Sequence, residues 1–134
     1  MSPNVVVLAT LRPMMSRTVL SLAAAGLLAL PAAASSATLH TCRLTVKEQQ
    51  GFGVTYVGSL KVRGVTCITG KRVIRSFQSC RKAHGGLKGY CPRSTLILGF
   101  HCTEARGGVP TQFSSKVTCT KATRRVVFTY TQNT

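Results

Sequence analysis

The sequence predicts a small α+β domain, stapled by disulfides, in which one helix packs on an antiparallel sheet in the order β-β-α-β-β-β. Three observations lead to this prediction. Several segments alternate apolar and polar residues with the period of a strand, one segment repeats its apolar residues with the period of a helix, and six cysteines follow an apolar N-terminal segment. One helix and several antiparallel strands in a short chain are typical of the α+β class.

The first 37 residues have the three parts of a secretory signal peptide. Two basic residues, Arg12 and Arg17, precede an apolar run at residues 18–30, and small residues follow it. The run is shorter than the roughly 20 apolar residues that a membrane-spanning helix needs. We therefore expect export with cleavage after Ala34 or Ala37, and the alternative is a membrane anchor that is never cut.

The translation start is open among Met1, Met14 and Met15, because a start at either later methionine gives a more compact signal. Residues 38–134 are then expected to form one exported domain, secreted or held at the cell envelope. A domain of this length buries a limited fraction of its surface, so its margin of stability is thin. Additional covalent links are expected for that reason.

Six cysteines, an even number, all lie in the expected domain, which in an oxidising compartment indicates three disulfides. Each disulfide typically stabilises a fold by ~2–4 kcal/mol. The layout of the predicted hairpins favours bonds between neighbours in the sequence, and a bond that joins the helix to the sheet is the alternative. The favoured pairs are Cys42–Cys67, Cys80–Cys91 and Cys102–Cys119, and the alternative pair is Cys67–Cys119. A zinc site is not expected, because the chain lacks the C-x2-C and H-x3-H spacings of zinc ligands.

Two alternating segments predict a hairpin before the helix. Residues 41–47 place apolar side chains on one face and polar ones on the other, and residues 56–65 alternate in the same way. Glycines at residues 51–53 break the pattern between them, as a turn requires. The residues assigned to one face of the second strand are Tyr56, Gly58, Leu60 and Val62.

Residues 67–82 are predicted to form the helix. Thr66 precedes them as an N-cap residue, and two glycines after residue 84 supply a stop. Basic residues in the last turn suit the helix dipole. The apolar residues at helical spacing are Val73, Ile74, Phe77 and Cys80.

The C-terminal part of the chain predicts a three-stranded meander after a loop at residues 83–93. Residues 95–103 form the first strand, with Leu96, Leu98, Phe100 and Cys102 on one face. Turns at residues 106–110 and 121–124 then separate strands at residues 112–120 and 125–131.

The charge of the chain is strongly positive, with 18 Lys and Arg against two Glu and no Asp, a net charge of +16. Without Arg12 and Arg17 the expected domain keeps about +14, opposed only by Glu48 and Glu104. Charge of this density indicates anionic partners, and a solvated surface that merely aids solubility is the alternative.

A cationic ridge on the helix is the predicted binding surface. Lys71, Arg75, Gln78 and Lys82 follow helical spacing with Arg72 beside them, opposite the apolar face and without acidic partners on the helix. Basic residues of the strands extend this surface. The residues predicted to bind a polyanion are Lys61, Arg63, Lys71, Arg72, Arg75, Lys82, Arg124 and Arg125. Most aromatic residues fall on predicted core faces, so stacking on nucleic-acid bases is not expected.

Enzymatic activity is not expected, because general acid–base catalysis needs paired titratable groups and this chain has few. Its lack of Asp excludes a Ser-His-Asp triad, and paired cysteines leave no thiol nucleophile. No catalytic residue, metal or cofactor is predicted. One enzymatic alternative is a small secreted ribonuclease with His84 and His101 as acid and base and Lys88 as the stabilising cation.

Several motifs of the second half resemble small secreted cysteine-containing proteins of actinobacterial type. They are G-V-T-C-I-T-G-K-R-V-I-R-S-F, G-Y-C, L-G-F-H-C-T, K-V-T-C and R-R-V-V-F-T-Y, and the resemblance covers most of residues 60–131. The resemblance implies export and an α+β fold with one helix. It implies no catalytic or binding residue.

The sequence thus predicts a monomeric, exported, non-enzymatic protein that binds anionic polymers or surfaces at the cell envelope. A cell-wall polymer or a membrane surface is the expected partner, bound by charge alone, and unspecific nucleic-acid binding is a further alternative. The alternative functions are a cationic antimicrobial or competition factor and the ribonuclease.

Overall fold

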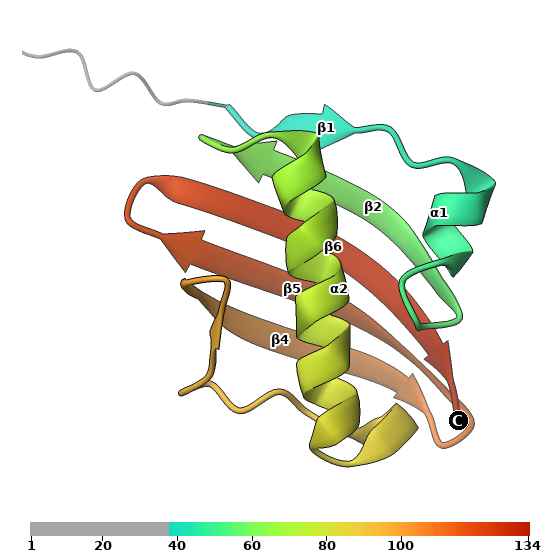
Figure 1. Cartoon of the computed structure of the whole chain (residues 1–134). Helices are drawn as coiled ribbons and strands as arrows, with labels where there is room; N and C mark the ends of the chain where they lie inside the picture. The colour runs from blue at the N-terminus through green and yellow to red at the C-terminus, as the bar shows by residue number, and fades with distance from the viewer. Residues whose placement is uncertain (1–37) are drawn as a thin grey trace, which may run out of the picture. The chain divides into compact units, whose positions relative to one another are not determined.

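The computed structural model of this chain describes residues 38–134, so the expected signal at residues 1–37 lies outside the described residues. A six-stranded antiparallel sheet has the strand order β1-β2-β6-β5-β4-β3, and the long helix α2 lies across one of its faces (Figure 1). The elements in chain order are β1 (His40–Cys42), α1 (Val46–Gln50), β2 (Tyr56–Arg63), α2 (Cys67–Ala83), the 3-10 turn η1 (Gly86–Lys88), β3 (Leu96–Ile97), β4 (Phe100–Val109), β5 (Gln112–Lys121) and β6 (Arg124–Asn133).

The predicted class, a small α+β domain with three disulfides, is confirmed, whereas the predicted element order is wrong. The observed order is β-α-β-α-β-β-β-β, with the additional short helix α1 and the additional short strand β3. None of the helices in residues 38–134 is both long and apolar enough to cross a membrane.

The predicted strand at residues 41–47 is replaced by the short strand β1 and the helix α1. Thr45 caps this helix: its side chain accepts a hydrogen bond from the backbone N–H of Glu48, and the Glu48 side chain accepts one from the Thr45 backbone. This capping box satisfies two N–H groups that a helix start otherwise leaves free. The alternation of apolar residues was therefore outweighed by a local capping signal.

Helix α2 confirms the predicted helix and its cap, since the Thr66 side chain accepts a hydrogen bond from the backbone N–H of Thr69. Gly70 lies where this helix crosses β2. A Cβ atom at Gly70 would meet Cγ1 of Val62 at 2.8 Å and the side chain of Leu60 at 3.2 Å. Glycine is less favourable than alanine in a helix by ~1 kcal/mol, but at this position it permits the close approach of α2 to the sheet.

Strand β2 departs from its predicted faces because its register with β6 shifts between Val57 and Ser59. A bulge of this kind moves the residues before it to the opposite face. Val57 is consequently buried, while Tyr56 and Gly58, which the alternation assigned to the core side, are exposed. Leu60 and Val62 lie beyond the shift and are buried as predicted.

The predicted strand at residues 95–103 is interrupted by a two-residue turn at Leu98 and Gly99, both of which have positive φ. Two residues of positive φ are what a tight hairpin turn between antiparallel strands requires. The turn makes β3 and β4 separate strands and places Ile97, not Leu96 or Leu98, in the core. Strand β4 then extends to Val109, so the turn predicted at residues 106–110 lies at Pro110 and Thr111.

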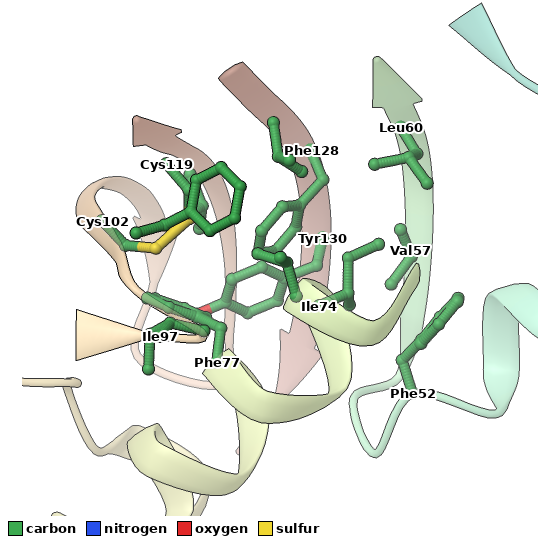
Figure 2. Packing of buried hydrophobic residues seen from close by; sticks show 14 of the residues in the cluster. Phe52, Val57, Leu60, Ile74, Phe77, Ile97, Cys102, Cys119, Phe128 and Tyr130 are labelled. Carbon is green, nitrogen blue, oxygen red and sulfur yellow. A yellow bond between two sulfur atoms is a disulfide. The ribbon is translucent and has the colours of Figure 1, made fainter. Parts of the chain in front are cut away.

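The core lies between α2 and the covered face of the sheet (Figure 2). Phe77 of α2 meets Phe128 of β6 edge to face, with ring centroids 5.7 Å apart. Val73 and Ile74 of the same helix are fully buried. An apolar helix face on one side of an antiparallel sheet leaves the other side of the sheet free for polar residues.

The disulfides join Cys42 to Cys67, Cys80 to Cys91 and Cys102 to Cys119, which confirms the pairing in sequence order and excludes the alternative pair Cys67–Cys119. The first links β1 to the start of α2, the second links the end of α2 to the following loop, and the third joins opposite residues of β4 and β5. Both ends of α2 are therefore covalently held, which limits the separation of the helix from the sheet.

Candidate anion-binding site

The predicted cationic residues do not form one surface, because they divide between the two sides of the sheet. Lys71, Arg72, Arg75 and Lys82 project from α2 on the covered side. Lys61, Arg63 and Arg125 belong to the opposite side, since they alternate with the buried residues of β2 and β6 that pack under the helix. Arg124 lies with the helix residues, as the pocket described below shows.

The predicted helix ridge is interrupted, because Gln78 is 1% exposed and lies in the core. Its side-chain oxygen accepts a hydrogen bond from Nε of Arg81, which is itself completely buried. The ridge was assigned from spacing alone, and the sheet curls far enough around α2 to cover this position. The remaining cations of α2 are separated along the helix rather than continuous.

Lys71 has an acidic partner that the helix sequence alone did not reveal. Its ammonium group donates to Oε1 of Glu48 at 2.5 Å, across the contact between α2 and α1. This hydrogen bond, with the backbone hydrogen bond from Thr45, lowers the pKa of Glu48 from 4.5 to about 2. Lys71 is therefore neutralised and contributes little to a surface for anions.

A pocket of about 350 Å³ lies at the N-terminal end of α2 and gathers three cations. Arg72 reaches it from the helix, Lys121 from the end of β5 and Arg124 from the start of β6. Thr66 and Thr69 contribute hydroxyl groups, and Leu98 and Phe100 form an apolar wall. We call Arg72, Lys121 and Arg124 the cationic triad.

The triad has no carboxylate neighbour, because both glutamates of the chain are engaged elsewhere. Glu48 pairs with Lys71. Glu104 pairs with Arg106 at 2.7 Å and also accepts hydrogen bonds from Ser115 and Tyr130. Cations that face a shared concavity without a counter-charge repel one another and attract anions.

Further cations flank the triad on the uncovered side of the sheet. Arg63 and Arg125 lie directly opposite each other on β2 and β6. The Nε of Arg63 donates to the backbone oxygen of Thr123 at 3.2 Å, which holds this side chain against the β5–β6 turn. The Nε of Arg125 is buried and has no hydrogen-bond partner among residues 38–134. Five cations therefore lie around one end of the domain.

Lys121 was not among the predicted binding residues. It forms the last pair of the β5–β6 hairpin with Arg124, so the two cations flank the turn residues Ala122 and Thr123. The predicted turn at residues 121–124 already implied that its two flanking residues lie opposite each other. Two basic residues in those positions are the signal that could have identified Lys121.

A second polar cluster lies on the covered side, toward the other end of α2. Arg81 donates to the side-chain oxygens of Gln78 and Gln132, the latter at 3.0 Å, and to the backbone of Leu87. Burial lowers the pKa of Arg81. The hydroxyl of Tyr130 donates to Glu104, and burial together with this hydrogen bond raises the pKa of Tyr130 to about 12. Most of its polar groups are paired with one another, which stabilises the fold, whereas the Nε2 of Gln78 is buried without a hydrogen-bond partner among residues 38–134.

The residues of the ribonuclease alternative are not brought together. His84 caps the C-terminal end of α2 on the covered side, where its Nδ1 lies 2.8 Å from the backbone oxygen of Cys80. His101 alternates with the buried Phe100 and Cys102 and so faces the uncovered side of the sheet. The sheet lies between the two imidazoles. In the part of the chain that the structure describes, no group of three metal-ligating side chains is present.

Neither models of protein families, nor curated proteins, nor solved structures give a match to this chain.

Proposed function

We propose that this protein is an exported, non-enzymatic basic protein that binds anionic polymers of the cell envelope at the cationic triad. The observation that carries the proposal is the convergence of Arg72, Lys121 and Arg124 on one pocket without a carboxylate. The three disulfides are compatible with an extracellular protein, because such bonds persist in oxidising compartments.

The division of the cations between the pocket and the neighbouring strand pair favours a chain of separated anionic groups over a single large anion. One anionic group enters the pocket between the three cations, and its neighbours along the polymer contact Arg63 and Arg125 around the turn. The hydroxyls of Thr66 and Thr69 lie in the same pocket and are hydrogen-bonded to each other at 3.1 Å, which leaves one hydroxyl hydrogen to donate to an anionic oxygen. The site therefore takes a phosphate- or carboxylate-bearing linear polymer.

The absence of enzymatic activity is part of the proposal. This part is supported by the positions of His84 and His101, which lie on opposite sides of the sheet and therefore cannot act on the same substrate molecule. Proton transfer requires both groups within hydrogen-bond reach of one substrate. Cleavage of RNA by the purified protein would contradict this part of the proposal.

A titration with linear polyphosphate tests the proposal. The amide NMR signals of residues 63–72 and 121–125 should shift, and the logarithm of the binding constant should fall with the logarithm of salt concentration with a slope of about 2–4.5, as expected for three to five neutralised phosphates. Shifts spread evenly over all basic residues, with a much steeper slope, would indicate bulk attraction by the net charge and would overturn the proposal.

An anionic membrane surface is the second candidate, supported by apolar residues beside the triad. Leu98 lines the pocket and is 45% exposed, and Ile68, between Thr66 and Thr69, is 73% exposed. Exposed aliphatic side chains next to cations suit the boundary between lipid headgroups and acyl chains. Release of dye from anionic vesicles, together with loss of bacterial viability, would favour this antimicrobial function. Vesicle binding without leakage would favour simple adhesion.

A further inference from the structure

Strand β4 presents an edge that is not covered by any other strand of residues 38–134. Among these residues, β3 pairs only with Phe100 and His101, so residues 102–109 pair with β5 on one side and with no strand on the other (Figure 1). Within residues 38–134, no backbone hydrogen bond from the preceding loop reaches this part of β4. The edge lies away from the cationic triad, which is formed by α2, β5 and β6.

The register defines which backbone groups of this edge are free. Two-residue turns separate Val109 from Gln112 and Ile97 from Phe100, and residues that flank such a turn form a hydrogen-bonded pair. Odd-numbered residues of β4 therefore bond to β5. The N–H and C=O groups of Glu104, Arg106 and Gly108 point outward from the sheet.

The edge lacks several of the features that prevent strand addition. Natural edge strands are protected by charged side chains, especially lysine, by proline, by bulges, by a covering helix or loop, or by being short. The segment T-E-A-R-G-G-V at residues 103–109 contains neither lysine nor proline, and its pairing with β5 shows no bulge. Its two charged side chains, Glu104 and Arg106, bond to each other on the side of α2 and so balance each other's charge.

A pocket of about 520 Å³ opens along the last residues of this edge. Arg106 forms its rigid wall, because the guanidinium group stacks on the ring of Tyr90 at 3.5 Å and faces the ring of Phe113 at 4.4 Å. The same group donates to the backbone oxygen of Lys88 at 2.8 Å, which ties the preceding loop to β4. The pocket is preformed, as ligand pockets usually are.

Gly108 permits the close pairing of β4 with β5 at the end of this edge. A Cβ atom at this residue would lie 2.4 Å from the backbone oxygen of Gln112 and 2.6 Å from Cα of Phe113, both on β5, and its φ of +153° disfavours other residues. A segment that pairs with β4 would direct every second side chain to the side of the sheet on which the pocket lies.

We infer that the β4 edge and this pocket together bind an extended peptide segment with acidic side chains from another protein. The backbone of the segment pairs with Glu104, Arg106 and Gly108, and one of its apolar side chains contacts Tyr90 and Phe113 in the pocket. The exposed Lys88 lines the pocket and Lys116 lies opposite Ala105 on β5. Among residues 38–134, Glu104 is already paired with Arg106, so these two lysines face only the terminal carboxylate of Thr134, which also lines the pocket. The unbalanced charge therefore selects acidic residues.

A second copy of this chain fits the edge less well than an acidic peptide. Pairing β4 with β4 brings together two copies of a chain whose net charge is +16, with Lys88 and Lys116 of both near the contact. Like charges across such a contact cost several kcal/mol. The partner is therefore a different polypeptide, and the inference does not depend on the function proposed for the triad.

The test uses the oxidised full chain and a short capped peptide that alternates Glu and Val. The amides of Glu104, Arg106 and Gly108 should exchange with solvent freely in the free protein and at least about ten-fold more slowly with the peptide bound. The control is the same peptide with every second backbone nitrogen methylated, which keeps charge and apolar surface but cannot pair with a strand. It should bind at least about ten-fold more weakly. Equal binding of both peptides would overturn the inference.

Two protein variants of equal charge locate the site. Ala105→Glu places a carboxylate on the exposed side of the β4 edge and should weaken binding of the acidic peptide at least about ten-fold. Thr41→Glu makes the same charge change at the opposite edge of the sheet, on β1, and should have little effect. The inference would be contradicted if both variants weakened peptide binding equally. It would also be contradicted if the peptide slowed amide exchange only at residues near the triad. A dimer at physiological salt that protects the same amides would assign the edge to self-association and overturn it as well.

Discussion

Lys121 and Arg124 lie directly opposite each other on β5 and β6, at the pair that closes the turn of Ala122 and Thr123. Both also line the pocket that Arg72 enters from α2. Like charges at opposite positions of a sheet destabilise it, with pair energies of roughly 0.2–1 kcal/mol. The free domain therefore carries unrelieved repulsion at this end, and a bound anion removes it.

Arg124→Gln should leave the free energy of unfolding unchanged or raise it by up to about 0.5 kcal/mol at low salt, because it removes this repulsion. Urea denaturation at low and high salt measures the effect, and the gain should shrink as salt screens the charges. Arg43→Gln, at an exposed residue of the loop after β1, is the control for the loss of one positive charge. A loss of more than ~1 kcal/mol in Arg124→Gln alone would mean that this cation stabilises the fold.

Gly70→Ala should destabilise the fold by about 1–3 kcal/mol although alanine favours helices. The added methyl group would lie 2.8 Å from Cγ1 of Val62, so α2 and β2 must separate to accept it. Ser79→Ala, at an exposed residue of the same helix, is the control and should have an effect within about 0.5 kcal/mol. Thermal unfolding distinguishes the two variants, and equal melting temperatures would contradict the close packing described here.

The class of fold could be predicted from the sequence because α2 and most of the strands obey simple periodicities. The Thr66 cap, the apolar spacing of the helix and the sequential disulfides were all recognised. The errors arose where a local feature outweighed periodicity. They were the capping box at Thr45, the bulge after Val57 and the turn at Leu98, and each depends on backbone geometry that apolar patterning does not report.

Arg81→Ala should destabilise the fold by about 2–4 kcal/mol, because it leaves a cavity and deprives buried acceptors of their donor. The guanidinium group of Arg81 is completely buried and donates to Gln78 and Gln132. Lys82→Ala, the exposed next residue, is the matched control and should change stability by less than about 0.5 kcal/mol. Chemical denaturation measures the free energy of unfolding of both variants. Similar values for the two would show that the buried cluster does not stabilise the fold.

Glu48 should contribute to the acid sensitivity of the domain. Its pKa is lowered from 4.5 to about 2, chiefly by the hydrogen bond from Lys71. A lowered folded-state pKa gives stability that is fully present above about pH 4.5 and is lost as the pH falls through about 2. In Glu48→Gln, the melting temperature should therefore depend less on pH over this range. An unchanged acid slope in the variant would refute the Lys71–Glu48 pair.

The candidate site could be predicted only in part, because charge is visible in a sequence and its grouping in space is not. Arg72 and Arg124 were among the predicted residues, yet Lys121 joins them only through the β5–β6 register. Lys71 was assigned to the same surface, but its partner Glu48 comes from a helix that the alternation of residues 41–47 concealed. Gln78 was placed in solvent because helical spacing does not reveal how far a sheet curls.

The most direct test of the central claim compares two triple variants that remove the same charge. The first, R72Q/K121Q/R124Q, removes the triad, and the second, R43Q/K47Q/R93Q, removes three exposed cations outside the pocket. Binding of linear polyphosphate at physiological salt should weaken at least about ten-fold in the first variant and less than about three-fold in the second. Equal weakening in both would show that the net charge alone attracts the polymer and would contradict a site at the triad.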